Sequence, residues 1–286
     1  MLRSRLMLRS RRGPVAESGY RSRKARGAAY FTSRRQYDDL DVVIRRYPSS
    51  AAIGPVFVLV HGIGVSSRYF QPVAAELAKI GSVYLVDLPG YGSAPNPRRD
   101  VTIADHAAVL GHVLRESELA NPVLVGHSMG SQVVSRLAVD FPEVSDRIVL
   151  MAPTMCPEFR SPGVAVARLL SDIWREPLRM KLIALADYVV RCGIPYFLKQ
   201  VPHLLGDRIE DRLGDIRART LVMRGDGDVI VPAVWSRRVA GLIPRGSLVE
   251  VIGPHVVMFT DPVSVAEAIA EHAKGGSAKA PGGTDA

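Results

Sequence analysis

Short apolar runs alternate along the chain with segments whose apolar positions recur every three or four residues. Such runs suit strands that are buried on both faces of a parallel sheet. The strand candidates are residues 41–47, 55–60, 82–86, 122–125, 148–151, 220–223 and 247–252. Helical spacing falls in residues 67–80, 101–118, 129–140, 232–241 and 262–273. This alternation predicts an α/β fold with a mostly parallel sheet and right-handed crossovers.

The alternation stops between residues 154 and 216. This stretch has no strand candidate, and its short helical patterns are interrupted by Pro157, Pro162, Pro177, Pro195 and Pro202. We predict a helical insertion over residues 154–216, within a core made of residues 36–153 and 217–274. The segment 275–286 is rich in Gly, Ala and Ser and is predicted to be a disordered tail.

Composition changes this picture mainly at the N-terminus. The chain of 286 residues is 47% apolar, which is enough for one large domain. Its net charge of +9 comes from residues 1–35, which hold eleven basic residues and one acid, so the remainder is nearly neutral. We predict a basic, disordered tail over residues 1–35. A transit peptide and a tether to anionic lipid or nucleic acid remain alternatives for this tail.

The apolar runs, the cysteines and the motifs of the sequence bear on the protein's location and on its cofactors. No apolar run approaches the roughly 18 residues that span a bilayer. The two cysteines, Cys156 and Cys192, do not form a disulfide framework and fit a reducing compartment. We therefore expect a cytoplasmic protein. No metal-ligand cluster, phosphate loop or dinucleotide fingerprint occurs in the sequence, so we expect no metal and no cofactor.

The strongest chemical signal is the pentapeptide Gly126-His127-Ser128-Met129-Gly130, which lies between an apolar strand and a helical pattern. A serine on a tight strand-to-helix turn has a strained backbone, and the flanking glycines leave room for it. The turn exposes the hydroxyl at the carboxyl edge of the sheet. We predict that Ser128 is a nucleophile.

A hydroxyl needs a base, and the base needs a carboxylate that fixes its tautomer. His255 follows the last strand candidate, so its loop reaches the same sheet edge as Ser128. Asp226 and Asp228 both follow the preceding strand candidate. We favour Asp228 as the partner of His255 and assign Asp226 to holding its own loop by hydrogen bonds.

An oxyanion needs hydrogen-bond donors where its charge develops. The amide of Met129 lies at the start of a helix, where the dipole favours an anion. The second donor is expected from the turn His61-Gly62-Ile63-Gly64, and we choose the amide of Ile63. The same glycines could instead serve only to reverse the chain.

Five motifs in order resemble the α/β-hydrolase superfamily over residues ~38–273. They are His61-Gly62-Ile63-Gly64, Asp87-Leu88-Pro89-Gly90-Tyr91-Gly92, the serine pentapeptide, Gly225-Asp226-Gly227-Asp228 with Pro232, and Gly253-Pro254-His255. The resemblance implies a mostly parallel eight-stranded sheet with helices on both faces, and a helical cap after the sixth strand. One departure is Ser131, where many relatives carry a further glycine.

The serine narrows the chemistry that this resemblance implies. Relatives that open epoxides or remove halide carry an aspartate at this position, so Ser128 favours acyl transfer to water. We expect a carboxylic ester hydrolase (class EC 3.1.1) that acts on a small molecule with an apolar portion, since the insertion is rich in apolar residues. Two alternatives are a carbon–carbon hydrolase of vinylogous diketones and a non-catalytic ligand receptor. Amide, lactone and perhydrolase reactions use the same chemistry.

Overall fold

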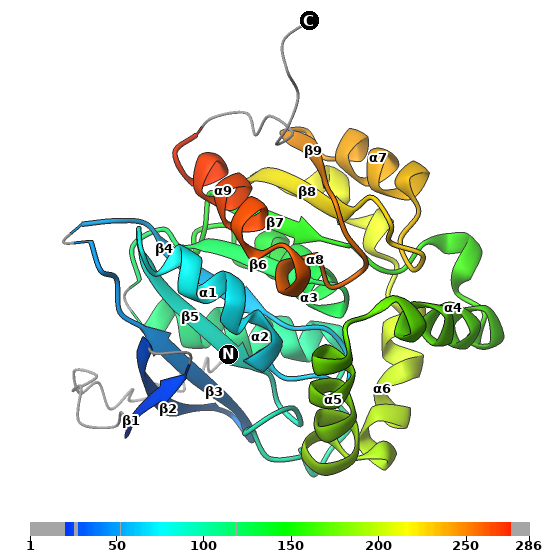
Figure 1. The fold of residues 1–286 in the computed structure, drawn as a ribbon, viewed down its shortest axis with the longest axis horizontal. Helices are drawn as coiled ribbons and strands as arrows, with labels where there is room; N and C mark the ends of the chain where they lie inside the picture. The colour runs from blue at the N-terminus through cyan, green and yellow to red at the C-terminus, as the bar shows by residue number, and fades with distance from the viewer. Residues whose placement is uncertain (1–20, 26–27, 52, 118, 276–286) are drawn as a thin grey trace, which may run out of the picture.

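The computed structural model describes residues 21–25, 28–51, 53–117 and 119–275. Nine strands form one sheet in the order β1-β2-β3-β5-β4-β6-β7-β8-β9, which runs through the middle of the molecule (Figure 1). The strands are β1 (Arg21–Ala25), β2 (Ala28–Tyr37), β3 (Leu40–Tyr47), β4 (Val56–Val60), β5 (Ser82–Asp87), β6 (Val123–His127), β7 (Arg147–Met151), β8 (Arg219–Gly225) and β9 (Gly246–Val251). Pairing is antiparallel from β1 through β2 and β3 to β5, and parallel from β5 to β9.

This is the predicted α/β-hydrolase fold, and the prediction of a mostly parallel sheet is confirmed. Strands β2 to β9 account for the eight strands that were expected. Strand β1 adds one antiparallel strand at the edge of the sheet, so the described residues form nine strands.

The prediction of a disordered tail over residues 1–35 is wrong for part of that segment. Residues 21–25 form β1, and residues 28–35 belong to β2, which pairs with β3 from Phe31 opposite Arg46 to Tyr37 opposite Leu40. The guanidinium of Arg34 donates to both carboxylate oxygens of Asp41, at 2.7 and 2.6 Å. Backbone pairing and this local partner outweigh the basic composition. Residues 1–20 and 276–286, where the tails were also predicted, lie outside the described residues.

The central strands send alternate side chains to opposite faces of the sheet. In β4, for example, Val58 and Val60 join one buried cluster, whereas Phe57 and Leu59 join the other. The first cluster packs under α2 (Ile103–Glu116), α3 (Met129–Asp140) and α7 (Ala233–Leu242). The second packs under α1 (Gln71–Leu77), α8 (Val257–Thr260) and α9 (Pro262–Ala273), and α1 and α9 cover that face in Figure 1. The sheet is therefore buried on both faces, as its continuous apolar runs predict.

Most predicted helices are present with shifted ends. The pattern over residues 67–80 becomes a 3₁₀ turn, η2 (Ser67–Phe70), followed by the short helix α1. Pro72 lies in the first turn of α1, where its missing N–H is not needed. Thr102 and Asp105 form a reciprocal capping box at the start of α2. The four-residue helix α8 is too short to leave a periodic signal and was not predicted.

Between β7 and β8 the chain is helical, as predicted for residues 154–216. Its elements are η3 (Pro157–Phe159), α4 (Pro162–Arg175), α5 (Leu178–Ala186), the π-helix η4 (Asp187–Cys192), α6 (Ile194–Gly206), η5 (Ile209–Asp211) and η6 (Leu213–Asp215). We call residues 154–216 the helical segment. Its helices α4, α5 and α6 gather at one side of the molecule (Figure 1). None of the described helices is long and apolar enough to cross a membrane.

Two buried histidines give the fold a testable pH dependence. Burial lowers the pKa of His106 and of His272 to about 4. The unfolded chain binds these protons with a pKa near 6.5, so it takes up more protons than the folded chain between pH 6.5 and 4. The free energy of unfolding should therefore fall as the pH decreases through this window, by about 3 kcal/mol for each histidine.

Urea unfolding at pH 7 and at pH 5.5 measures this slope. His272→Gln should make the slope shallower than it is in the wild-type protein. Equal slopes in wild type and His272→Gln would contradict the assignment.

Candidate active site

Ser128 lies on a sharp turn between the end of β6 and the start of α3. Its backbone has φ 56° and ψ −119°, a conformation that costs a non-glycine residue about 1–3 kcal/mol. A Cβ at Gly126 would collide with the carbonyl oxygen of Gly130, and a Cβ at Gly130 would collide with that of Val60. Both glycines are therefore needed for the turn, as the pentapeptide predicts.

Asp228 and His255 meet beyond the carboxyl ends of β8 and β9. Oδ2 of Asp228 lies 2.9 Å from Nδ1 of His255, and both residues are buried. The other carboxylate oxygen accepts hydrogen bonds from the amides of Ile230 (2.8 Å) and Val231 (2.9 Å). The carboxylate is thus fixed at both oxygens. We assign the proton of His255 to Nδ1, which leaves Nε2 as the basic nitrogen.

Asp226, the alternative acid, faces a different partner. Its Oδ1 accepts a hydrogen bond from the amide of Gly253 (2.9 Å), and the amide of Gly227 donates to the carbonyl of Gly253 (3.0 Å). These bonds join the loop after β8 to the loop that carries His255. Asp226 therefore holds a loop, although it bonds the neighbouring loop rather than its own.

The imidazole of His255 lies next to the serine turn. Its ring centroid is 4.7 Å from that of His127, the residue before Ser128. Ser128 itself is 8% exposed. Ser128 and the Asp228–His255 pair therefore lie at one largely enclosed edge of the sheet. The structure thus brings the three predicted residues to the same rim.

The two predicted oxyanion donors also lie at this rim. The N–H of Met129 belongs to the first turn of α3, where helix amides have no intrahelical acceptor. On the other side, a Cβ at Gly62 would lie 3.1 Å from Cβ of Ser128, so the loop that carries Ile63 passes against the serine. The hydroxyl of Tyr91 contacts the sulfur of Met129 at 3.6 Å and helps to hold that side chain.

A buried Tyr69–His127 pair joins three loops of the site. The amide of Gly62 donates to the hydroxyl of Tyr69 (3.0 Å), which lies 2.8 Å from Nδ1 of His127. Nε2 of His127 lies 3.0 Å from the carbonyl oxygen of His255, so Nε2 carries the proton and Nδ1 accepts from Tyr69. Burial lowers the pKa of His127 well below its usual value, which keeps this ring neutral. The pair links the Gly62 loop, the serine turn and the His255 loop.

The loop after β5, which begins at Asp87, has a structural role. Asp87 is buried and pairs with Arg45 at 2.8 Å, and its oxygens accept from the amides of Ser67 (2.9 Å) and Ser93 (2.8 Å). Burial alone would raise the pKa of Asp87, but Arg45 and His61 together lower it. The ion pair anchors the loop that begins at Asp87 beneath the rim.

Two residues of the helical segment reach the site and were not assigned a role from the sequence. Tyr188, on η4, packs against Gly64, where a Cβ would collide with its ring, and its hydroxyl lies 3.4 Å from the carbonyl of Ile63. Glu176 is 8% exposed and its Oε1 accepts from the amide of Val256 (3.4 Å), next to His255. No sequence motif identifies Tyr188 or Glu176, because neither residue belongs to a pattern with a recognisable spacing.

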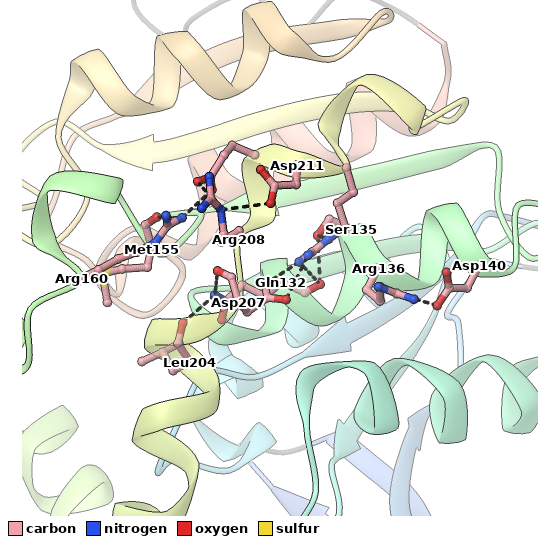
Figure 2. A network of polar contacts seen from close by, with 12 residues as sticks. Gln132, Ser135, Arg136, Asp140, Met155, Arg160, Leu204, Asp207, Arg208 and Asp211 are labelled. Carbon is pink, nitrogen blue, oxygen red and sulfur yellow. Dashed lines mark hydrogen bonds and ion pairs between the residues drawn. The ribbon is translucent and has the colours of Figure 1, made fainter.

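The helical segment is tied to the serine helix at its far end. Arg212 binds both oxygens of Asp207 (3.0 and 2.6 Å), the hydroxyl of Ser135 (2.9 Å) and the carbonyl of Gln132 (3.0 Å). The side-chain amide of Gln132 donates to the carbonyl of Leu204 (2.9 Å). Figure 2 shows Gln132 and Ser135 on α3 facing Asp207 and Leu204. The segment is thus fixed relative to α3, the helix that follows Ser128.

His61 and His106 are also buried, and their hydrogen bonds do not involve Ser128 or His255. His61 accepts from the amide of Leu88 (3.1 Å), and His106 contacts Gln200 (3.2 Å) in the core. Among the described residues, no group of three or more His, Cys, Asp or Glu side chains is placed to hold a metal ion.

A family model described as the Alpha/beta hydrolase family matches residues 57–268. The chain belongs to this family.

Two relatives illustrate how far this likeness extends in sequence. An uncharacterized protein of Mycobacterium tuberculosis is 27% identical over 229 residues, which cover 77% of this chain and 65% of that relative. The chain therefore aligns to less than two thirds of that relative's length. A pimeloyl-acyl-carrier-protein methyl ester esterase of Pseudoalteromonas atlantica is 37% identical over 111 residues, which cover 37% of this chain and 40% of the esterase.

Among solved structures, the enol-lactonase from Burkholderia xenovorans has a TM-score of 0.73 at 18% identity, covering 84% of this chain and 99% of the lactonase. An esterase from Exiguobacterium antarcticum has a TM-score of 0.72 at 17% identity, covering 82% of this chain and 96% of the esterase. At these low identities, the two structures show a similarity of fold alone.

The Tyr69–His127 pair generates a prediction about stability. Tyr69→Phe removes a buried hydroxyl and leaves the amide of Gly62 and Nδ1 of His127 without this partner. The free energy of unfolding should fall by about 1–3 kcal/mol. Tyr37→Phe, at a tyrosine that is 36% exposed, should change it by less than about 0.5 kcal/mol. Urea unfolding of both variants measures the difference, and equal stabilities would contradict the role of the pair.

Proposed function

We propose that the protein hydrolyses a carboxylic ester through an acyl-enzyme on Ser128. The observation that carries the proposal is the buried Asp228–His255 pair at 2.9 Å, at the same rim as a serine with a left-handed backbone. A serine hydroxyl is a weak nucleophile at neutral pH, and a histidine fixed by a carboxylate is the group that activates it.

In the first half of the proposed reaction, Oγ of Ser128 attacks the ester carbonyl carbon while Nε2 of His255 takes the hydroxyl proton. The C=O double bond becomes a single bond, and the negative oxygen is held by the amides of Met129 and Ile63. Asp228 stabilises the imidazolium that forms. The tetrahedral intermediate then expels the alcohol, which receives the proton from His255, and leaves the acyl group on Ser128.

In the second half, a water molecule attacks the acyl carbonyl carbon and gives its proton to His255. The same two amides hold the second oxyanion. Collapse of this intermediate returns the proton to Oγ of Ser128 and releases a carboxylic acid. The steps use side chains, backbone amides and water, so the proposed reaction requires no metal and no cofactor.

We also propose that residues 154–216 act as a cap on a core made of residues 36–153 and 217–274. The support is the contact of Tyr188 with Ile63 and Gly64 in the oxyanion loop. Tyr188 and Phe197 pack edge to face with centroids 5.0 Å apart, which brings aromatic surface to this contact. An apolar part of the substrate would bind against such side chains, while the ester carbonyl reaches Ser128.

The choice of an ester is supported by the names of two similar proteins. A methyl ester esterase and an enol-lactonase both act on a carbonyl carbon bonded to oxygen, as their names state. Serine, histidine and oxyanion donors suit this bond in either an open ester or a lactone.

A cytoplasmic location and binding of nucleic acid or anionic lipid by the basic N-terminal residues stay predictions from the sequence.

Replacing the nucleophile gives the first test of this function. Turnover of short p-nitrophenyl esters by Ser128→Ala should fall by at least about 10³-fold, because no acyl-enzyme can form. Ser171→Ala, at an exposed serine on α4, should keep wild-type turnover. Ester turnover that survives in Ser128→Ala would contradict the proposal, as would cleavage of a vinylogous diketone with no ester turnover.

The two neighbouring aspartates supply a matched pair of variants. Asp228→Asn should lower kcat by about 10⁴-fold, because an amide at this position favours the wrong tautomer of His255. Asp226→Asn, two residues away, alters a loop contact with Gly253 and should cost less than about tenfold. Steady-state kinetics on one ester compare the two. A larger loss in Asp226→Asn than in Asp228→Asn would reverse the assignment.

A further inference from the structure

The helical segment carries a set of apolar side chains that face solvent. We call it the leucine face. Its members lie on α5, η4 and α6, and their side chains are largely exposed. They are Leu178 (72% exposed), Leu182 (59%), Leu185 (60%), Val189 (53%), Ile194 (55%) and Leu198 (60%).

The spacing of these residues places them on one side of the helices. Leu178, Leu182, Leu185 and Val189 are four, three and four positions apart, which is the repeat of one helix face. Ile194 and Leu198, also four apart, continue the pattern on α6. In Figure 1, α5 and α6 lie at the same end of the molecule. The four residues on α5 and η4 are therefore neighbours along one helix face, and Ile194 and Leu198 lie on a second helix at the same end.

The opposite side of α5 is apolar as well. Met180 is 3% exposed and belongs to the buried cluster on the α1 and α9 side of the sheet, and Ala184 packs against that cluster. A surface helix normally places polar residues opposite its buried stripe. Because α5 is apolar on two sides, its exposed side calls for a second apolar environment besides the protein core. Single exposed leucines are ordinary, but a contiguous patch marks a site of interaction.

The charges around the leucine face indicate which apolar environment it contacts. Within residues 177–206, all of which the structure describes, the only acidic residue is Asp187. Asp187 is fully buried and accepts from the amide (2.9 Å) and hydroxyl (2.6 Å) of Ser66. The basic residues Arg179 and Lys199 are exposed on the same helices as the leucine face. The exposed charges that these helices carry are therefore positive, and Asp100, an acid outside this range, pairs with His203 on α6 (2.9 Å).

We propose that the leucine face docks onto the surface of an anionic lipid bilayer. Exposed leucines beside basic side chains are the composition of helices that lie in the interface plane, with apolar residues among the acyl chains and Lys or Arg at the phosphates. The basic surround complements anionic headgroups, and this favours lipid over a second copy of the chain, whose leucine face would be equally positive.

Docking would bring the candidate active site close to the bilayer. Tyr188, which contacts Ile63 of the oxyanion loop, is the neighbour of Val189 in the leucine face. The proposal does not depend on the ester reaction, because lipid binding is measured without turnover. The failure of one proposal therefore leaves the other standing.

The test is flotation of the full chain with vesicles. The wild-type protein should float with vesicles of phosphatidylcholine and phosphatidylglycerol, and less with phosphatidylcholine alone. Leu182→Ser with Leu185→Ser should weaken binding to the anionic vesicles by at least about tenfold, although the charge is unchanged. The matched control is Val234→Ser with Leu242→Ser on α7, at side chains that are 71% and 42% exposed. The control should bind as wild type does.

Two further measurements keep the result decisive. Circular dichroism verifies that each variant is folded, and Arg179→Glu with Lys199→Glu gives a second route if the serine variant is not. This charge variant should also bind anionic vesicles at least about tenfold more weakly. Three outcomes would overturn the proposal: no flotation of wild type with anionic vesicles, unchanged flotation of the folded serine or charge variant, or a wild-type dimer in light scattering that the serine variant dissociates. Unchanged flotation would assign any lipid binding to other residues, such as the basic N-terminus.

Discussion

The backbone of Ser128 is the constraint on which the rest of the site depends. Its φ of 56° is unfavourable for a residue with a Cβ, and it persists because β6 and α3 are both packed into the core. Gly126 and Gly130 permit the close approach of the helix to β6 and to β4. The strain places the hydroxyl above the carboxyl edge of the sheet, where the loops after the parallel strands converge.

The loops around Ser128 are held to one another by hydrogen bonds. Tyr69 and His127 connect the loop of Gly62, the serine turn and the backbone of His255. Burial keeps His127 unprotonated, so it can accept from one loop and donate to another. Asp226 and Gly253 add a second link between the loops of Asp228 and His255. The positions of Asp228 and His255 therefore depend on hydrogen bonds between these loops.

The sequence predicted those parts of the site that follow from local pattern. Apolar runs located the parallel strands, and a motif after each strand located Ser128, Asp228 and His255. It missed Tyr188 and Glu176, because their contacts with Ile63 and Val256 join residues 125 and 80 positions apart and depend on how the helical segment packs. It also took residues 21–35 for a tail. There the basic composition hid β1 and the first part of β2. Strand β1 pairs with β2, and β2 is held by backbone pairing to β3 and by the bond from Arg34 to Asp41.

The central claim is that the fold, through this turn and the His255–Asp228 pair, makes one serine hydroxyl nucleophilic. Mass spectrometry after treatment with a fluorophosphonate measures that property directly, without knowledge of the substrate. The account predicts one covalent adduct, on Ser128, which forms in the folded protein and not after unfolding in urea. A folded protein that remains unmodified at Ser128, or that is modified equally at other serines, would contradict it.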